Sequence, residues 1–266
     1  MNMRSLSVNR VVVKIGTNTI TREGGGLNYG LIEDIAEQIS ELKRQDKDFI
    51  IVTSGAIGLG CSELSLEDRP SDVVLRQVCA AIGQSKVMEA YHHAFEHYGG
   101  VVAQILLTYD DFEDEEKHKN FRTGLNELLR LKVTPIVNEN DVVATDEIGK
   151  TFGDNDRLSA MVAVDTRADL LIILTDVNGL YDGNPRDTDG ARLIKEVRAV
   201  TPEIEAMADQ NGSKLAVGGM ITKINAAKIC MEAGCDLIIA NGRETDVIRR
   251  IVEGEEIGTW FCRKRT

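Results

Sequence analysis

The chain has 266 residues, 42% of them hydrophobic and 28% charged, a composition typical of a globular protein with a substantial core. Its formal net charge of -12 argues against binding to a nucleic-acid backbone, which requires a basic face, but allows a local basic pocket for a small anion. No apolar run approaches the roughly 20 residues of a membrane span, and "MNMRSLSVNR" lacks the apolar core of a signal peptide. We therefore expect neither nucleic acid nor membrane among the partners.

Short apolar runs alternate along the chain with stretches of helical periodicity. In chain order, the runs are "VVVKI" (11–15), "FIIVT" (49–53), "VVAQILLT" (101–108), "TPIVN" (134–138), "DLLIILT" (169–175) and "DLIIA" (236–240). Most are apolar throughout rather than alternating, as expected for strands covered on both faces. The helices are expected between the first two runs, where Leu31, Ile35, Ile39 and Leu42 recur at helical spacing, and at 71–97, 154–167 and 220–233.

This βαβα order predicts an α/β fold, a three-layer α/β/α sandwich around a mainly parallel central sheet. We expect a single domain, 1–266, divided near residue 165 into two lobes. The five cysteines, at positions 61, 79, 230, 235 and 262, include no CxxC pair and indicate reduced thiols in a cytoplasmic protein.

Ligands of open α/β sheets bind beyond the carboxyl ends of the strands, and glycine-rich loops follow several of the predicted strands. The loops are "KIGTN", "TSGAIGLG", "ENDVV" with "GDND", and "DVNGLYDGNPR", while "VGGMITK" opens the helix before the last long apolar run. Glycines let backbone N–H groups approach an anion, and helix N-termini attract negative charge. Together with Lys14 and Lys223, these loops indicate a polyphosphate site. The P-loop signature GxxxxGK[ST] is absent, and no GxGxxG follows the first strand. The phosphate site therefore needs a template other than the P-loop or the dinucleotide-binding fold.

The ordered set "VVVKIGTN", "IVTSGAIGLG", "VNENDVV", "FGDNDRLSA", "LTDVNGLYDGNPR" and "GGMITK" resembles the amino acid kinase family over residues 8–262. Within it, "NENDVV" followed by "GDND" is similar to the branch that acts on glutamate. Two features depart from the family pattern. The chain ends too early to hold the C-terminal PUA domain of many bacterial members, and Val217 stands where threonine is usual before the glycine pair.

The resemblance implies ATP-dependent phosphorylation of the γ-carboxylate of L-glutamate, the first step of proline biosynthesis, with Mg2+ accompanying ATP. It implies an amino-acid-binding lobe at about 1–165 and a nucleotide-binding lobe at about 166–266. It also implies feedback inhibition by proline, a homo-oligomer, and channelling of the product to the next reductase of the pathway.

The same resemblance gives three residues catalytic roles: Lys14 and Lys223 contact the transferring phosphates, and Asp156 lies between the lysines and orients them. Each has a simpler interpretation. Lys14 would be a strand-end lysine that reaches solvent, Lys223 a solvated lysine early in a helix, and Asp156 a helix cap. A cation near a helix N-terminus is disfavoured by the helix dipole, so a bound phosphate explains Lys223 better.

Substrate contacts are expected from three segments, and the resemblance places them at Ser54, Gly55, Ala56, Asp141 and Asn155. Ser54 could instead be an ordinary N-cap, and Asp141 a turn residue. Chemistry favours Asp141 as a ligand, because a free amino acid brings an ammonium group whose natural partner is a recessed carboxylate. An N-acylated substrate would not need one.

For ATP, the resemblance assigns Lys14, Thr175, Asp176, Val217, Gly218, Gly219, Met220, Ile221, Thr222 and Lys223, and the loop 179–186 is a candidate lining of the adenine or ribose pocket. No protein metal ligand is assigned. His93 and His97 have the i, i+4 spacing of a metal pair but no third ligand, so a solvated helix face is the better interpretation. The acidic run 110–116 indicates a solvated helix start.

A carboxylate nucleophile has a reference pKa of about 4.3 and is already ionised at neutral pH, so no general base is needed. Catalysis should therefore consist of positioning and charge neutralisation. Two alternatives stay open: a sister kinase that acts on N-acetylglutamate or a nucleoside monophosphate, and a non-catalytic nucleotide or amino-acid sensor on the same fold.

Overall fold

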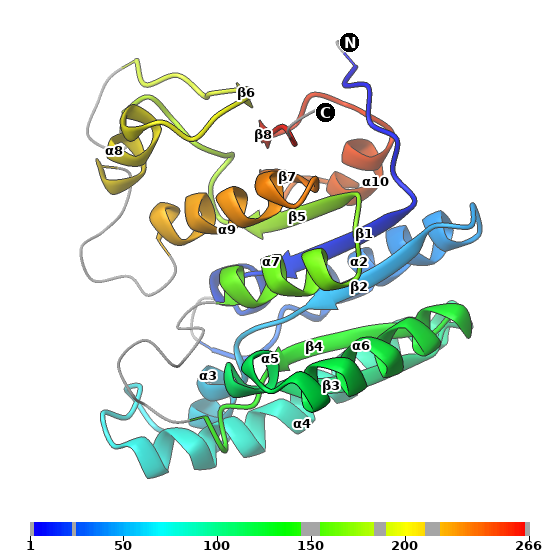
Figure 1. Ribbon diagram of the computed structural model, residues 1–266. Helices are drawn as coiled ribbons and strands as arrows, with labels where there is room; N and C mark the ends of the chain where they lie inside the picture. Colours follow the sequence, from blue (N-terminus) through cyan, green and yellow to red (C-terminus); the bar gives the residue numbers. More distant parts are fainter. Residues whose placement is uncertain (1–2, 23–24, 145–154, 184–189, 211–218, 264–266) are drawn as a thin grey trace. The chain divides into compact units, whose positions relative to one another are not determined.

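The computed structural model describes residues 3–22, 25–144, 155–183, 190–210 and 219–263 (Figure 1). The chain divides into two compact units. The first unit is Ile15–Phe152, and the second unit is Met1–Lys14 together with Gly153–Thr266.

The first unit contains three parallel strands in the order β3-β4-β2. They are β2 (Asp48–Val52), β3 (Val102–Leu107) and β4 (Thr134–Glu139). β4 pairs with both neighbours and is buried along its whole length. This burial explains why its sequence shows no polar alternation.

Six helices of the first unit are described: α1 (Thr17–Ile20), α2 (Tyr29–Lys43), α3 (Ala56–Glu63), α4 (Val73–His97), α5 (Asp110–Glu113) and α6 (Glu115–Arg130). Side-chain caps set where the long ones begin, because Asn28, Asp72 and Asp114 each accept a hydrogen bond from a backbone N–H of the first turn. In Figure 1, α6 lies in front of the strands, while α2 and α4 lie behind them.

Helices α3 and α4 approach each other backbone to backbone. A Cβ atom on Gly60 would lie 1.9 Å from the carbonyl oxygen of Cys79, and one on Gly83 would lie 1.8 Å from the carbonyl oxygen of Ala56. No side chain fits at either position, so the two glycines fix the separation of the helices. Gly58, on the exposed side of α3, has nothing within 4 Å of its ideal Cβ.

Replacement of either buried glycine should therefore destabilise the first unit. We expect Gly60→Ala and Gly83→Ala each to lower the free energy of unfolding by about 1 to 3 kcal/mol, because the backbones must separate. The matched control Gly58→Ala should raise it by about 0.5 to 1 kcal/mol through helix propensity. Urea titrations followed by circular dichroism measure all three. Equal effects at Gly58 and Gly60 would contradict this description of the packing.

The second unit contains the strand order β1-β5-β7-β8-β6. The strands are β1 (Arg10–Ile15), β5 (Leu170–Thr175), β6 (Glu196–Val197), β7 (Asp236–Asn241) and β8 (Thr259–Phe261). β5 runs parallel to β7, and β6 runs parallel to β8. Among the described pairs, β7 with β8 is the antiparallel exception.

The described helices of the second unit are α7 (Asn155–Asp165), α8 (Pro202–Gln210), α9 (Met220–Glu232) and α10 (Val247–Val252). α7 and α9 pack against one another and cover β5 and β7 (Figure 1). Their amino-terminal ends lie close together, because Lys223 in the first turn of α9 donates a hydrogen bond to Asp156 in the first turn of α7.

The predicted α/β fold with mainly parallel strands between helices is confirmed. Each of the six apolar runs forms a strand, and the three helices predicted by range are α4, α7 and α9. The short strands β6 and β8 were not predicted, since two or three residues are too few to show a pattern. In the part of the chain that the structure describes, no helix combines the length and apolar character needed to cross a membrane. All five cysteines are free thiols.

Candidate functional site

Three charged side chains form a buried cluster in the second unit. The Nζ atom of Lys14 lies 2.7 Å from Oδ1 of Asp156, and Nζ of Lys223 donates a hydrogen bond of 3.0 Å to Oδ2 of the same carboxylate. Lys14 is 2% exposed, Asp156 0% and Lys223 5%. Buried charges require pairing, and this carboxylate is shared between the two ammonium groups. The three groups carry a net charge of +1.

Each member of the cluster comes from a different element. Lys14 lies in β1, Asp156 in the first turn of α7, and Lys223 in the first turn of α9. The hydroxyl of Thr222 lies 2.8 Å from Oδ2 of Asp156 and 2.7 Å from the carbonyl oxygen of Gly219, so its single proton is shared between these two acceptors. Two helix N-termini and two ammonium groups thus meet at one point, and this combination favours a bound anion.

The cluster unites four of the residues predicted to act in catalysis or ATP binding: Lys14, Asp156, Thr222 and Lys223. Asp156 lies between the two lysines, as the family resemblance implied. Neither lysine reaches solvent, so the interpretation of both as solvated side chains is wrong. The hydrogen bond from Thr222 to Asp156 was not predicted.

Thr175 and Asp176 lie at the carboxyl end of β5. Thr175 is buried, and its hydroxyl donates to Oδ1 of Asp176 at 3.2 Å, while Asp176 is exposed. In the register of the sheet, Thr175 lies opposite Asn241 of β7. Asn241 donates a side-chain hydrogen bond of 2.9 Å to Asn178. The two asparagines were missed in the sequence, although adjacent parallel strands bring their carboxyl ends together.

The glycine-containing segment before α9 is described in part. Gly219 is the N-cap of α9 and offers no side-chain cap, and Met220 is buried. Ile221 follows in the first turn. Val217 and Gly218 lie outside the described residues, as do residues 184–186 of the predicted adenine or ribose loop.

The predicted substrate segment after β2 starts helix α3. Gly55 is the N-cap of this helix, with φ 94° in the left-handed region, and no side chain caps the helix. The left-handed conformation favours glycine at this position, and an added Cβ would also be tight, at 3.2 Å from a methyl carbon of Ile20. The alternative interpretation of Ser54 as the N-cap is wrong, and Ser54 is buried.

A small cavity of about 20 Å³ lies in the first unit. It brings together two residues predicted to bind substrate, Ala56 and Asp141. The full lining is Ala56, Ala80, Gln84, Leu106, Glu139, Asn140, Asp141 and Val142. Asn155, also predicted to bind substrate, is the first residue of α7 in the second unit and is buried.

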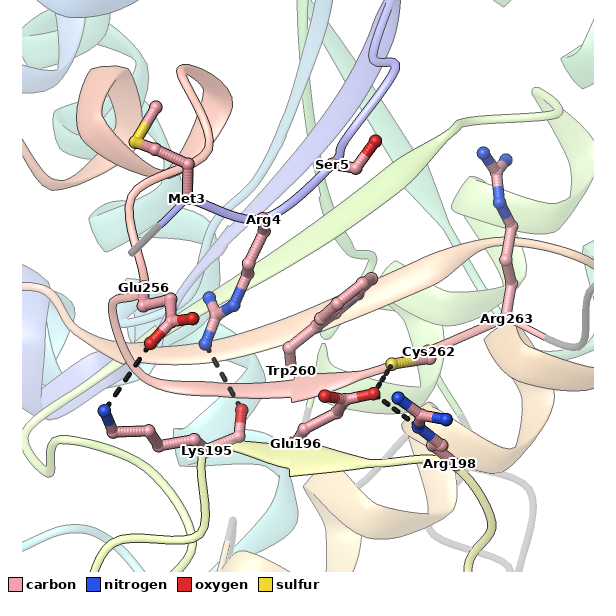
Figure 2. Close-up of a pocket in the computed structure, with 10 residues that line it drawn as sticks. All are labelled: Met3, Arg4, Ser5, Lys195, Glu196, Arg198, Glu256, Trp260, Cys262 and Arg263. Carbon is pink, nitrogen blue, oxygen red and sulfur yellow. Dashed lines mark hydrogen bonds and ion pairs between the residues drawn. The ribbon is translucent and has the colours of Figure 1, made fainter. Parts of the chain in front are cut away.

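A larger cavity of about 720 Å³ lies in the second unit and contains none of the predicted site residues (Figure 2). Its lining is Met3, Arg4, Ser5, Lys195, Glu196, Arg198, Glu256, Trp260, Cys262 and Arg263. The Nε of Arg198 lies 2.6 Å from a carboxylate oxygen of Glu196, and Lys195 lies 3.5 Å from Glu256. Burial raises the pKa of the Cys262 thiol to about 12, so it is not a nucleophile at neutral pH.

Arg4 has a structural role at this cavity. Its guanidinium donates to the carbonyl oxygens of Ile257, Gly258 and Lys195, and lies 5.8 Å from the ring centre of Trp260 (Figure 2). Burial lowers the pKa of Arg4. These bonds attach Arg4 to the residues between α10 and β8 and to Lys195, the residue before β6. We therefore assign no ligand to this cavity.

Other residues considered from the sequence lie on the surface. His93 and His97 are exposed on α4, and the acidic run 110–116 forms α5, which has no buried residue, and the start of α6. Within the described ranges, no group of three or more histidine, cysteine, aspartate or glutamate side chains is arranged to hold a metal ion. Asp156 already binds two ammonium groups.

Comparison with known proteins gives the class. The model of the amino acid kinase family matches residues 9–241. The chain therefore belongs to the amino acid kinase family, as its motifs predicted. Solved structures agree in fold: UMP kinase from Bacillus anthracis has a TM-score of 0.65 at 16% identity over 97% of both chains. Isopentenyl phosphate kinase has 0.64 at 19% identity over 94% of this chain and 99% of its own.

Within the family, glutamate 5-kinases are among the relatives of similar sequence. The glutamate 5-kinase of Methanosarcina mazei is 49% identical over 97% of this chain and 69% of its own length. That of Clostridium perfringens is 44% identical over 96% of both chains. These relatives agree with the glutamate branch that "NENDVV" and "GDND" predicted.

Proposed function

We propose that this chain is a glutamate kinase, which transfers the γ-phosphoryl group of ATP to the γ-carboxylate of L-glutamate. The products are γ-glutamyl phosphate and ADP, and the reaction begins proline biosynthesis. The observation that carries this proposal is the 49% identity to a glutamate 5-kinase over nearly the whole chain. The buried cluster of Lys14, Asp156 and Lys223 supplies a physical basis for phosphoryl transfer.

The chemical difficulty of this reaction is the approach of one anion to another. The γ-carboxylate is ionised at neutral pH, so no residue has to remove a proton from it. The phosphates of ATP repel it, and negative charge on the transferring group must be stabilised. We assign this work to the ammonium groups of Lys14 and Lys223.

Asp156 is a positioning residue in this proposal. Its two oxygens hold one ammonium group each, at 2.7 and 3.0 Å, so both lysines are fixed before substrate arrives. Such preorganisation avoids reorientation of the donors during the reaction. Thr222 fixes the carboxylate in turn through its hydrogen bond to Oδ2.

The nucleotide contacts are assigned to two segments of the second unit. The start of α9 with the preceding loop (Val217, Gly218, Gly219, Met220, Ile221 and Thr222) would bind the phosphates through backbone N–H groups and the helix N-terminus. Thr175 and Asp176 at the end of β5 would bind the nucleoside part. Mg2+ would enter as the MgATP substrate, bound by phosphate oxygens.

Glutamate itself would be bound by Ser54, Gly55, Ala56, Asp141 and Asn155. The uncapped N-terminus of α3 offers backbone donors to a carboxylate. Asp141 offers a carboxylate to the ammonium group. An N-acetylated substrate has no such cation, and this difference separates the proposal from a sister kinase.

The substrate assignment predicts a selective defect in one variant. Asp141→Asn should raise the KM for glutamate by roughly 10- to 100-fold, because a charge-assisted bond becomes a neutral one, and leave the KM for ATP nearly unchanged. Release of ADP, measured with glutamate and with N-acetylglutamate, tests this. Wild-type protein should use glutamate alone. Equal turnover of both acids would favour the sister kinase, and ATP binding without turnover would favour the sensor.

Regulation and assembly follow the same family reasoning. We propose inhibition by proline at a site that overlaps that of glutamate, a homo-oligomeric cytoplasmic enzyme, and transfer of the unstable acyl phosphate to the next reductase. Overlap means that proline inhibition should weaken as glutamate increases, which initial-rate measurements test.

A further inference from the structure

Gln84 carries a buried hydrogen-bond donor that no described residue satisfies. The side chain lies on α4, is 9% exposed, and lines the small cavity of the first unit. Its Nε2 atom is buried without a hydrogen-bond partner. Buried donors are nearly always satisfied in folded proteins, so this amide is available to a water molecule or to a ligand group that enters the cavity.

The backbone fixes which end of the Gln84 amide carries the free donor. The N–H of Glu139 donates to Oδ1 of Asn138 at 2.9 Å, which turns the Nδ2 of Asn138 toward Gln84. That Nδ2 donates to Oε1 of Gln84 at 2.8 Å. Exchange of the oxygen and nitrogen of Gln84 would bring two NH2 groups face to face. Nε2 of Gln84 is therefore held on the side away from Asn138.

The neighbouring glycine places this donor beside α3. Gly83 packs directly on the carbonyl of Ala56, the first residue of α3, and Ala56 and Asp141 line the same cavity as Gln84. The cavity lining thus combines an amide donor, an uncapped helix N-terminus and two acidic residues, Glu139 and Asp141. This set is complementary to the head group of an α-amino acid, a carboxylate and an ammonium on one carbon.

We propose that Gln84 is a specificity-determining residue, whose Nε2 donates a hydrogen bond to the α-carboxylate of L-glutamate. This inference rests on the proposed function. Asp141 is assigned to the ammonium group, and the α-carboxylate shares a carbon with it, whereas the γ-carboxylate is three carbons further along. The volume of about 20 Å³ suits one water molecule, and a carboxylate oxygen would take its place.

The test compares L-glutamate with its α-amide, which keeps the γ-carboxylate and the ammonium but loses the α-carboxylate. Acyl phosphate is trapped with hydroxylamine, and kcat/KM is measured for both compounds. Gln84→Met should lower kcat/KM for glutamate roughly 10- to 100-fold and that for the α-amide much less. Gln84→Glu keeps an acceptor for Asn138 but repels the α-carboxylate. The preference for glutamate over the α-amide should therefore fall at least as much as in Gln84→Met.

The control is Gln45→Glu, which adds the same charge at an exposed position after α2 and should leave the preference unchanged. If Gln84 had only a structural role, its substitution would lower kcat/KM equally for both substrates or for neither. An unchanged preference for glutamate over the α-amide in both variants overturns the inference. If Gln84→Met fails to fold, Gln84→Glu decides alone. Wild-type protein that forms no acyl phosphate from glutamate would instead overturn the proposed function.

Discussion

Lys14→Ala and Lys223→Ala should each lower kcat by about 100- to 1000-fold while the affinity for ATP changes much less. The two ammonium groups are proposed to act on negative charge that develops during transfer, and an interaction of this kind lowers kcat when it is lost. Both lysines are held in place by Asp156, so the loss of either removes a preorganised donor. Hydroxamate formation measures kcat, and circular dichroism confirms folding.

The matched control for these variants is Lys228→Ala, on the same helix as Lys223. Lys228 is half-buried and pairs with Glu205, outside the cluster. Removal of a lysine of this kind should leave kcat within twofold or so. If both cluster variants kept near-normal kcat, the assignment of the lysines to catalysis would be refuted. A silent Lys223→Ala alone would mean that the phosphates are bound differently near Val217.

Asp156→Asn should be as damaging to kcat as the loss of a lysine, and should also destabilise the fold. The substitution keeps the size of the side chain but leaves two buried ammonium groups without their shared carboxylate. Removal of one partner from a buried ion pair typically costs about 3 to 5 kcal/mol. Denaturant titration measures the stability loss, and hydroxamate formation measures kcat.

The matched control for Asp156→Asn is a carboxylate outside the cluster, Glu232. Glu232→Gln makes the same change from acid to amide at the exposed end of α9 and should alter neither quantity. Excess MgATP should recover part of the lost stability of Asp156→Asn, because the bound phosphates compensate the positive charge of Lys14 and Lys223. Normal kcat in Asp156→Asn would show that the lysines do not depend on this carboxylate for their positions.

Much of the fold followed from the sequence because most of the longer strands are buried and therefore read as continuous apolar runs. Runs such as 134–138 and 169–175 have no polar alternation and can belong only to buried elements. The strands β6 and β8 show no such pattern, because their pairing depends on contacts made in the folded chain.

The residues of the candidate site were predictable from the sequence, and the family resemblance implied that Asp156 lies between the two lysines, but the local sequence patterns did not give these contacts. Lys14 was conspicuous as a charge within an apolar run, and Lys223 as a cation at a helix start. Their common partner, Asp156, is 67 residues from Lys223 along the chain, and no local pattern gives that distance. Gln84 had no signal at all, since "AAIGQSK" reads as ordinary helix and its free amide appears only when Asn138 is placed beside it.

The most direct test of the account is the product of the wild-type protein. Incubation with MgATP, L-glutamate and hydroxylamine, followed by mass spectrometry, identifies which carboxyl group is activated. We predict γ-glutamyl hydroxamate and ADP in equal amounts, with no hydroxamate from N-acetylglutamate. No hydroxamate from glutamate, despite bound ATP, would contradict the account.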